Sequence, residues 1–475
     1  MDRLAYRAQH QEAPVNQAST AESPVRHSLP DEDPVAVIGA GWAGLAAALE
    51  LVRAGRPVVL IEAAANPGGR GRSLVLDGAH LDNGQHILVG ACRQVLAQMR
   101  TVGVDPETAL HVLPFSLSLR ELLPEGGTRA FSLSPRSTRP WHLATALYRA
   151  LSGEKPSRRF AAMLGAARML AQAPDVDLPV AAWLRRGHQP PALIAGLWEP
   201  LCLAVMNTPV AEASAKIFQN VLQQTLRGSE RDARLLIPRM PLGALFPEPA
   251  LAWLRASGAE VHMSTRVTGI ATRVQGGFEL GLRGGARLHA GQVILATAPR
   301  AAERLLPASD ALAQARRALS ALGARSICTV YLRYPKPLVD LPPLTGLLGQ
   351  HGQWLLPRYL NGEPHWAAVV ISAAEVYPAP DARTRWQQVA RELAATFPGL
   401  GNPDSGRVVC EQSATFDARA GIDELRPDVR TGIPGLYLAG DHCARGLPST
   451  LEAAVQGGLQ AAAAVLQDAD PSLAR

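Results

Sequence analysis

Two short apolar runs, with a helical stretch between them, open the patterned part of the chain. Val35–Ile38 and Val58–Ile61 are uninterrupted aliphatic runs of strand length, and the second is followed by Glu62. Between them, Trp42–Ala54 is rich in alanine and leucine and stops before Gly55, a residue typical of a helix C-terminus. The pattern predicts a strand, a helix and a second, parallel strand, which form the βαβ unit of a Rossmann-type sheet.

Strands of the same kind return much later in the chain. The pattern predicts a turn and strand over 258–270, an apolar strand over 292–299 and a short strand over 435–441, and a helix to about Leu466 follows the last of them. Between the first unit and this return, residues 136–171 carry apolar side chains at helical spacing.

Three further segments alternate apolar and polar residues in the manner of β-strands. Residues 73–81 predict a hairpin that turns at Asp77-Gly78, and 326–334 and 366–372 predict strands of a second sheet. Residues 1–32 are polar and lack the apolar core of a signal peptide, so we expect a disordered extension. No run approaches the ~18 apolar residues of a spanning helix.

Composition and charge exclude some classes of function. The 475 residues are 47% hydrophobic and 19% charged, as in a globular protein of two or three domains. The net charge of +6 comes almost entirely from arginine, and no basic block with interleaved aromatics indicates a nucleic-acid surface. The five cysteines are scattered without a CxxC pair, which argues against a zinc or iron–sulfur site and favours a reducing compartment.

The first unit contains the pattern of a dinucleotide site. In Gly39-x-Gly41-x-x-Gly44, the first glycine allows the tight turn, the second lets backbone approach a pyrophosphate, and the third allows close helix–strand packing. The N-terminus of the following helix supplies amide donors to phosphate, and Glu62 is placed to bind a ribose diol. The alternative, an ordinary tight turn, does not account for the strand, the helix and the acid together.

The next residues indicate, by their resemblance to a known family, which dinucleotide the chain binds. Asn66-Pro67-Gly68-Gly69-Arg70 is similar to the GGR turn of FAD enzymes such as amine oxidases and phytoene desaturases. This resemblance implies FAD, with Arg70 facing the pyrophosphate.

Three later blocks make the resemblance more specific. The run 82–90 (DNGQHILVG), the WEPL and MNTP block at 198–209 and the tail 447–458 (LPSTLEAAVQGG) are similar to hydroxysqualene dehydroxylase, a family of FAD-dependent, desaturase-like enzymes of squalene and hopanoid biosynthesis. The resemblance covers residues 34–466. On residue chemistry alone, these blocks predict only a turn, an apolar helix and an N-capped terminal helix.

The family pattern implies an α/β fold with a Rossmann-type FAD-binding domain, similar to glutathione reductase, and a discontinuous α+β substrate domain. We expect the FAD-binding domain over 33–105, 255–300 and 405–475, and the substrate domain over 106–254 and 301–404. The expected cofactor-binding residues come from five segments of the chain. They are Gly39, Gly41, Gly44, Glu62, Gly69, Arg70, Gly84, Gln85, His86, Val267, Gly440, Asp441, Ser449 and Thr450. We expect no metal.

The resemblance also implies the reaction. Reduced FAD would deliver a hydride to the carbon of hydroxysqualene that loses its hydroxyl, giving squalene. This chemistry needs an acid near the hydroxyl, and His86 and His442 are the candidates because histidine titrates near neutral pH. Both histidines could instead serve only as hydrogen-bonding partners of the cofactor or backbone. Asp417 and Glu452 are weaker candidates.

Two other enzyme classes share this pattern. A carotenoid desaturase or isomerase would have the same fold and an apolar tunnel, but DNGQH and MNTP argue against it. Many flavin amine oxidases place a lysine near the flavin, at the start of a strand like 326–334, whereas the nearest lysine here is Lys336, beyond that strand.

The expected partners follow from the substrate. A long isoprenoid substrate suggests a protein that is cytoplasmic or lies peripherally on the inner face of the cytoplasmic membrane. The helices in 136–171 could simply be core helices, or one face, rimmed by Tyr148, Arg149, Arg158 and Arg159, could rest on the membrane. No second GxGxxG of comparable quality marks a nicotinamide site, so NAD(P)H by transient access or a partner protein would supply electrons.

Overall fold

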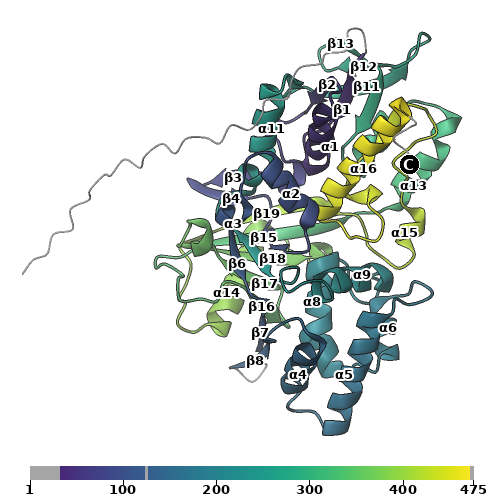
Figure 1. The fold of residues 1–475 in the computed structure, drawn as a ribbon. Coiled ribbons are helices and arrows are strands. Elements are labelled where there is room, and N and C mark those ends of the chain that lie inside the picture. Colours follow the sequence, from purple (N-terminus) through teal and green to yellow (C-terminus); the bar gives the residue numbers. More distant parts are fainter. Residues whose placement is uncertain (1–32, 124–126, 471–475) are drawn as a thin grey trace, which may run out of the picture.

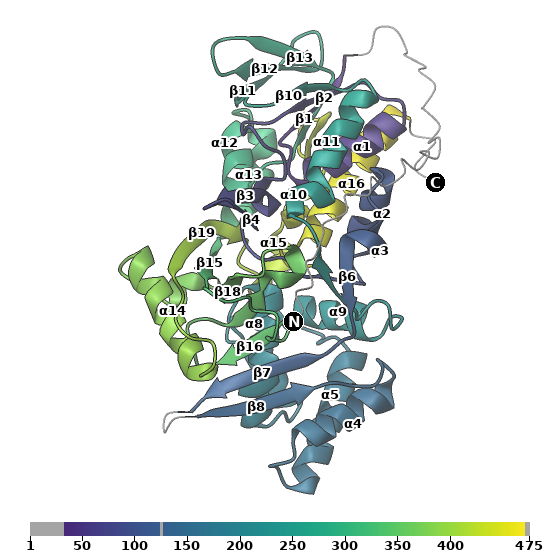
Figure 2. The same ribbon diagram turned by 90° about the vertical axis from the view of Figure 1, so that its left-hand side faces the viewer.

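The computed structural model describes residues 33–123 and 127–470, so the predicted disordered extension over 1–32 lies outside the described residues. Figures 1 and 2 show an elongated molecule with a parallel sheet towards one end, helices α4 and α5 at the other, and a larger sheet between them.

The parallel sheet is assembled from distant parts of the chain. Its order is β10-β2-β1-β14-β20, and every neighbouring pair is parallel. Val37 of β1 lies between Leu60 of β2 and Ile294 of β14, and all residues of β1 and β2 are buried. The strands are β1 (Val35–Ile38), β2 (Val58–Ile61), β10 (Glu260–His262), β14 (Gln292–Leu295) and β20 (Leu436–Leu438).

Two helices from opposite ends of the chain pack together on this sheet. The helices α1 (Trp42–Arg53) and α16 (Leu451–Ala469) lie side by side in Figure 1. A Cβ on Gly458 would lie only 2.1 Å from the carbonyl oxygen of Ala43, so glycine sets how closely the helices approach. The helix α11 (Pro247–Ala256) also packs on α1, and α2 (Arg93–Thr101) packs on α16.

A seven-stranded mixed sheet forms the middle of the molecule. Its order is β19-β15-β18-β17-β16-β7-β8, and only β16 and β7 run parallel. The helix α14 (Ala382–Thr396) packs on β19, β15 and β7. The strands are β7 (Leu117–Leu122), β8 (Thr128–Leu133), β15 (Arg325–Arg333), β16 (Thr345–Leu348), β17 (Trp354–Pro357), β18 (Trp366–Ser372) and β19 (Ser405–Thr415).

Helices form the far end of the molecule and join it to the larger sheet. Asn207 ends α8 in a left-handed conformation (φ 49°) and its side chain bonds Thr415 of β19 at 2.9 Å. The elements are α4 (Pro140–Ala150), α5 (Pro156–Ala171), α6 (Val180–Arg186), α7 (Pro191–Leu193), the π-helical turn η2 (Ile194–Trp198), α8 (Glu199–Met206) and α9 (Ala215–Leu226).

Smaller elements connect these layers. They include the two-stranded β3-β4 hairpin, two three-stranded sheets of order β11-β12-β13 and β5-β9-β6, and short helices. The strands are β3 (Ser73–Leu76), β4 (Ala79–Asp82), β5 (Leu88–Val89), β6 (Leu110–Leu113), β9 (Leu235–Pro238), β11 (Val267–Thr272), β12 (Phe278–Leu282) and β13 (Arg287–Ala290). The helices are η1 (Gly69–Gly71), α3 (Pro106–Ala109), α10 (Leu242–Leu245), α12 (Pro299–Leu305), η3 (Asp310–Leu312), α13 (Ala313–Ala321), η4 (Arg358–Asn361), η5 (Ala374–Val376), α15 (Ile422–Leu425) and η6 (Asp441–Cys443).

Most predicted elements are confirmed, including the turn at Asp77 and Gly78 (φ 51° and 80°). The single strand expected over 258–270 is wrong in one respect: the chain breaks at Ser264 (φ 55°), so β10 joins the parallel sheet and β11 joins another. The α/β fold is confirmed. The domain boundaries stay a prediction.

The cysteine argument requires a correction. Cys328 and Cys410 lie opposite each other on the neighbouring strands β15 and β19, with Cα atoms 4.1 Å apart, and form a disulfide. Cysteines scattered in sequence are therefore not all free, and the inference of a reducing compartment loses its basis. None of the described helices combines the length and apolarity that crossing a bilayer requires.

Candidate functional site

The candidate site lies where the parallel strands end. β1, β2, β14 and β20 all finish at one edge of the sheet, because parallel strands share a direction. The residues that follow them are Gly39, Glu62, Ala296-Thr297 and Gly440-Asp441. The sequence-predicted glycine motif, acid and GD pair are therefore brought together.

The glycine motif has the geometry of a phosphate cradle. Gly39 adopts φ 109°, and a Cβ on Gly44 would lie 1.9 Å from the carbonyl oxygen of Gly39. The N-terminus of α1 has no side-chain cap, and its first turn contains no acidic residue. Its N–H groups and partial positive charge thus remain available to an anion.

Glu62 is held at the end of β2. Its carboxylate accepts hydrogen bonds from the N–H groups of Ala40 and Ala64, both at 2.7 Å. Its carbonyl accepts the N–H of Thr265 at 2.8 Å, and buried Val267 follows two residues later. The predicted ribose-binding acid and the predicted adenine-binding valine are therefore neighbours.

An ion pair joins the GGR turn to the last strand. Arg70 donates to the Oδ1 atom of Asp441 at 2.5 Å and to the carbonyl of Ala414 at 2.8 Å. Burial lowers the pKa of Arg70, but Asp441 and Glu411 outweigh it and the pKa is raised. Burial raises the pKa of Asp441, but Arg70 and His442 hold it well below its usual range. Both groups are charged at neutral pH.

The start of α16 completes this wall. Thr450 accepts the N–H of Ala453 at 3.1 Å and is the N-cap, while the Ser449 hydroxyl accepts the N–H of Phe416. The Leu451 side chain reaches Gly71, where a Cβ would meet it at 3.1 Å. The α16 N-terminus thus lies against the GGR turn.

The loop 82–86 connects the two sheets. Asp82 accepts the N–H of Leu242 at 2.9 Å, and the Asn83 amide donates to the Arg70 carbonyl at 3.2 Å. Within the described residues, the side chains of Asp82, Asn83 and Gln85 all make hydrogen bonds. The His86 side chain makes none. Its half-buried ring is therefore free to meet a bound molecule.

Sequence reasoning missed two residues that hold this loop. Tyr331 on β15 donates to the Asp82 carbonyl at 2.7 Å and accepts from Gln85 at 2.9 Å. Arg358, 1% exposed, donates to Gln85 at 2.7 Å and lies 3.5 Å from the Asp82 carboxylate. The sequence does contain a signal for Arg358, because an arginine directly after the apolar strand 354–357 is expected to be buried, and a buried arginine requires a charged or polar partner.

The pKa values of the two candidate histidines are shifted in opposite directions. The pKa of His86 is lowered, because burial and Arg70 outweigh the opposing effect of Asp82. Burial also lowers the pKa of His442, but Cys443 and the Asp441 carboxylate raise it overall to about 9. Nδ1 of His442 lies 3.8 Å from Oδ1 of Asp441, and both ring nitrogens are buried without a partner.

The weaker acid candidates are engaged elsewhere. Asp417 accepts from Nε of Arg325 at 2.9 Å, and Glu452 accepts the N–H groups of Gln94 and Val95 at the start of α2, both at 3.0 Å. Burial raises the pKa of Glu452. Both carboxylates have structural roles.

The site fits a dinucleotide such as FAD. The uncapped α1 N-terminus and its glycines suit a pyrophosphate, and the buried hydroxyl of Thr297, beside Gly39, lacks a partner in the described chain. Among the residues described, no group of three or more His, Cys, Asp or Glu is placed to hold a metal ion.

Comparisons with known proteins agree with this geometry. The flavin-containing amine oxidoreductase family matches residues 42–466. Hydroxysqualene dehydroxylase of Rhodopseudomonas palustris is 32% identical, and the alignment covers 91% of this chain and 98% of that protein. The enzyme of the same name from Sinorhizobium fredii is 30% identical with the same coverage. Zeta-carotene desaturase of Capsicum annuum is 24% identical over 93% of this chain and 82% of that protein.

Solved structures share the fold. Cyclohexylamine oxidase from Brevibacterium oxydans superposes with a TM-score of 0.67 at 17% identity, covering 93% of this chain and all of that one.

Proposed function

The chain belongs to the flavin-containing amine oxidoreductase family, whose cofactor is FAD, and on that premise we propose that it converts hydroxysqualene into squalene. The observation that carries the proposal is the similarity to two hydroxysqualene dehydroxylases over nearly the whole length of each protein.

FAD is proposed to lie along the edge of the parallel sheet. Gly39, Gly41, Gly44, Gly69 and Arg70 would hold the pyrophosphate. Glu62 and Val267 would hold the adenosine half, and Gly84, Gln85, His86, Gly440, Asp441, Ser449 and Thr450 would line the flavin half. When bound and reduced, FAD supplies a hydride.

The chain's own contribution is to release the hydroxyl. Dehydroxylation breaks the allylic carbon–oxygen bond, forms a carbon–hydrogen bond at the same carbon, and releases water once the leaving oxygen has accepted a proton. His86 is the candidate we favour for contact with this oxygen, because its ring is partly exposed and makes no hydrogen bond in the described structure, whereas His442 is fully enclosed. Fully enclosed His442 would instead hold the Asp441 carboxylate in place.

Lysine placement argues against amine oxidation. Lys336 is exposed and lies beyond the end of β15, whose early residues are Ser326, Ile327 and the disulfide-bonded Cys328. The similarity to zeta-carotene desaturase keeps polyene desaturation as a second candidate function.

We also propose that the enzyme acts as a peripheral protein on the inner face of the cytoplasmic membrane, where a C30 isoprenoid is dissolved. Support comes from exposed apolar side chains on α4 and α5, among them Trp141 and Phe160. An external reductant, NAD(P)H or a partner protein, would reduce the flavin.

The direct test is a single turnover. The purified protein is reduced without oxygen and mixed with hydroxysqualene, and the extract is analysed by gas chromatography–mass spectrometry. We expect squalene to form in step with flavin reoxidation. Unchanged substrate with the flavin still reduced would contradict the proposal, and oxidised flavin that desaturates a carotenoid precursor would establish the second candidate.

A further inference from the structure

The positive charge of the protein is concentrated at the end opposite the proposed FAD site. Residues 128–174 contain eight arginine or lysine residues and one glutamate, a surplus of seven, whereas the whole chain has a surplus of six. This segment forms β8, α4 and α5, which lie together at one tip of the molecule in Figures 1 and 2. The tip therefore attracts anions although the rest of the chain is almost neutral.

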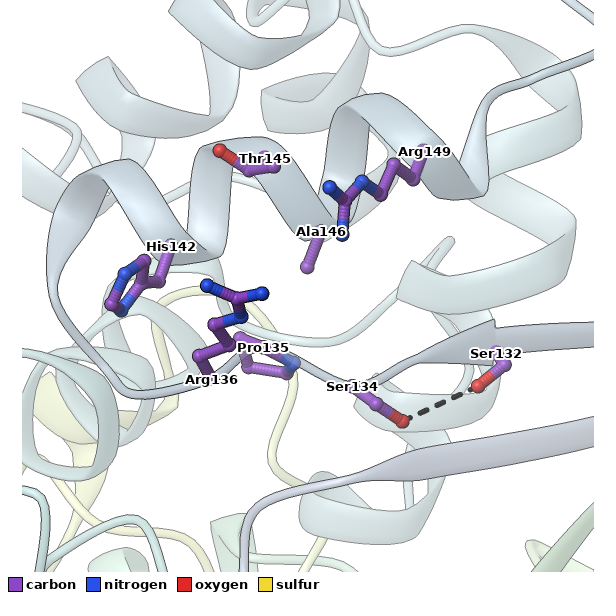
Figure 3. Close-up of a pocket in the computed structure, with 8 residues that line it drawn as sticks. All are labelled: Ser132, Ser134, Pro135, Arg136, His142, Thr145, Ala146 and Arg149. Atoms are coloured by element: carbon purple, nitrogen blue, oxygen red, sulfur yellow. Dashed lines mark hydrogen bonds between the residues drawn. The ribbon is translucent and has the colours of Figure 1, made fainter.

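A cavity of about 380 Å³ opens within this tip. The helix α4 contributes His142, Thr145, Ala146 and Arg149, which share one helical face, and the chain leaving β8 supplies the opposite wall (Figure 3). That wall consists of Ser132, Ser134, Pro135 and Arg136. We call this space the α4–β8 cavity.

Two unpaired arginines face the α4–β8 cavity. Figure 3 shows the guanidinium groups of Arg136 and Arg149 turned toward the space between α4 and the β8 end. Neither makes an ion pair, a hydrogen bond or a ring contact with its side chain in the part of the chain that the structure describes. Neighbouring arginines are engaged: Arg158 pairs with Glu154, and Arg159 donates to the Tyr148 carbonyl at 2.9 Å.

The remaining polar groups also suit an anion. Ser134 lies in a hydroxyl chain, 2.7 Å from Ser116 and 3.3 Å from Ser132, and hydroxyls can turn a proton toward an acceptor. His142 uses Nδ1 to bond Ser137 at 2.7 Å, which leaves Nε2 free. Among the described residues, no acidic side chain lines the cavity. Two guanidinium forks and hydroxyl donors match the oxygens of a phosphate group.

Exposed apolar side chains on the same helices favour the phosphate of a lipid over free phosphate as the ligand. Trp141 beside His142 on α4 is 58% exposed, and Phe160 and Leu164, one turn apart on α5, are 63% and 52% exposed. Arg139 stacks on the Trp141 ring at 5.4 Å, an arrangement suited to the boundary between headgroups and acyl chains. A ligand with a phosphate and an adjoining apolar phase matches this combination.

We propose that the α4–β8 cavity binds the phosphate of an anionic phospholipid and thereby docks the tip formed by α4 and α5 on a membrane. The proposal deepens the proposed function. It rests on that function in one respect: an enzyme with a lipid substrate must reach a bilayer. The arginines fix the headgroup while Trp141, Phe160 and Leu164 contact the acyl region.

The test uses the full-length, FAD-loaded protein and sedimentation with vesicles. One set of vesicles is phosphatidylcholine alone, and the other is an equal mixture of phosphatidylcholine and phosphatidylglycerol. We compare wild type with Arg136→Gln/Arg149→Gln and with the control Arg158→Gln/Arg168→Gln, which removes the same charge from exposed positions on α5 outside the cavity. Flavin absorbance and circular dichroism confirm that each variant is folded.

We expect wild type to bind the anionic vesicles and the cavity variant to bind more than about 30-fold more weakly, because general attraction to the surface accounts for about 1 kcal/mol per arginine and the cavity adds direct contacts with the phosphate. The control should lose distinctly less. Equal losses in the two variants would show general charge attraction and overturn the cavity assignment. Tight binding of inorganic phosphate, with no binding to either set of vesicles, would overturn the lipid as ligand.

Turnover of detergent-dispersed hydroxysqualene separates this proposal from the proposed function. We expect the cavity variant to retain wild-type turnover in detergent and to lose it only on anionic vesicles. An inactive wild type that still binds anionic vesicles through Arg136 and Arg149 would contradict the proposed function and leave the lipid site standing.

Discussion

Arg358 is the most deeply buried charged side chain near the loop 82–86, and its position depends on Asp82 and Gln85. Removing one partner of a buried ion pair leaves the other charge without compensation and typically costs about 3–5 kcal/mol. Because Asp82 also fixes Leu242 and the hairpin residue Ser73, the effect should extend across the join between the two sheets.

We therefore expect Arg358→Met to lower the free energy of unfolding by about 3–5 kcal/mol in urea titrations. The matched control is Arg333→Met, which removes an arginine from a half-exposed pair with Asp404 on the same sheet and should cost about 0–1 kcal/mol. Equal effects of the two substitutions would show that Arg358 is not holding the loop.

The two histidines predict different pH dependences for dehydroxylation. A proton donor must be protonated, so activity declines as pH rises through its pKa. If His86 donates, the single-turnover rate should fall once pH exceeds its lowered pKa, below the ordinary value of 6.5. If His442 donates, the rate should hold through neutral pH and fall only near pH 9.

Substitution separates the two assignments. We expect His86→Gln to retain FAD and reduce the rate by about 10²–10⁴-fold, the usual contribution of a general acid. His442→Gln should weaken FAD retention with a smaller effect on the rate of the loaded enzyme. Unchanged turnover of His86→Gln with full FAD content would exclude His86 as the acid.

At the scale of elements, the cofactor motifs were predictable because they are local. The strand, glycine turn, helix and acid over 35–62 follow from periodicity and backbone sterics within one short segment. The loop 82–86 was identified only by resemblance, because its partners Tyr331 and Arg358 come from distant strands. Similarly, Asn207 in MNTP ends α8 in a left-handed turn and ties it to Thr415, which no local pattern indicates.

The pairing of Cys328 with Cys410 was unpredictable for the same reason. The strand register that places them opposite each other is set by the whole of β15 and β19, and 82 positions separate them in the sequence. A covalent link across a loop of this length is expected to stabilise the fold by about 2–4 kcal/mol, chiefly by restricting the unfolded chain.

We accordingly expect Cys328→Ser to lower the urea midpoint of the oxidised protein. Adding a thiol reductant should lower the wild-type midpoint to that of the variant, while leaving the variant unchanged. Cys202→Ser, at a buried free cysteine, is the control whose midpoint should not respond to reductant. A wild-type midpoint that is insensitive to reductant would mean that the bond does not form in solution.

At the scale of the molecule, the proposed FAD residues link the beginning, middle and end of the chain. A ligand that binds only the folded state stabilises it by about 2.7 kcal/mol at 100 times its Kd, and by about 1.4 kcal/mol more for each further tenfold excess. We expect the Tm of deflavinated protein to rise continuously with added FAD. Riboflavin, which lacks the pyrophosphate and adenosine, should produce little shift, and an equal shift with riboflavin would contradict a role for the glycine motif.

The order of strands in the parallel sheet has a consequence for how the protein is made. β1 and β2 are complete at Ile61, but β20 and α16, which close the sheet and cover α1, begin only at Leu436. At ~5–20 residues per second, a ribosome needs roughly 20–75 s to synthesise the interval between them. During that time the face of α1 that packs on α16 awaits its partner. We therefore expect flavin capture to be an event of the finished chain, and newly made protein to need protection from aggregation until its last helix arrives.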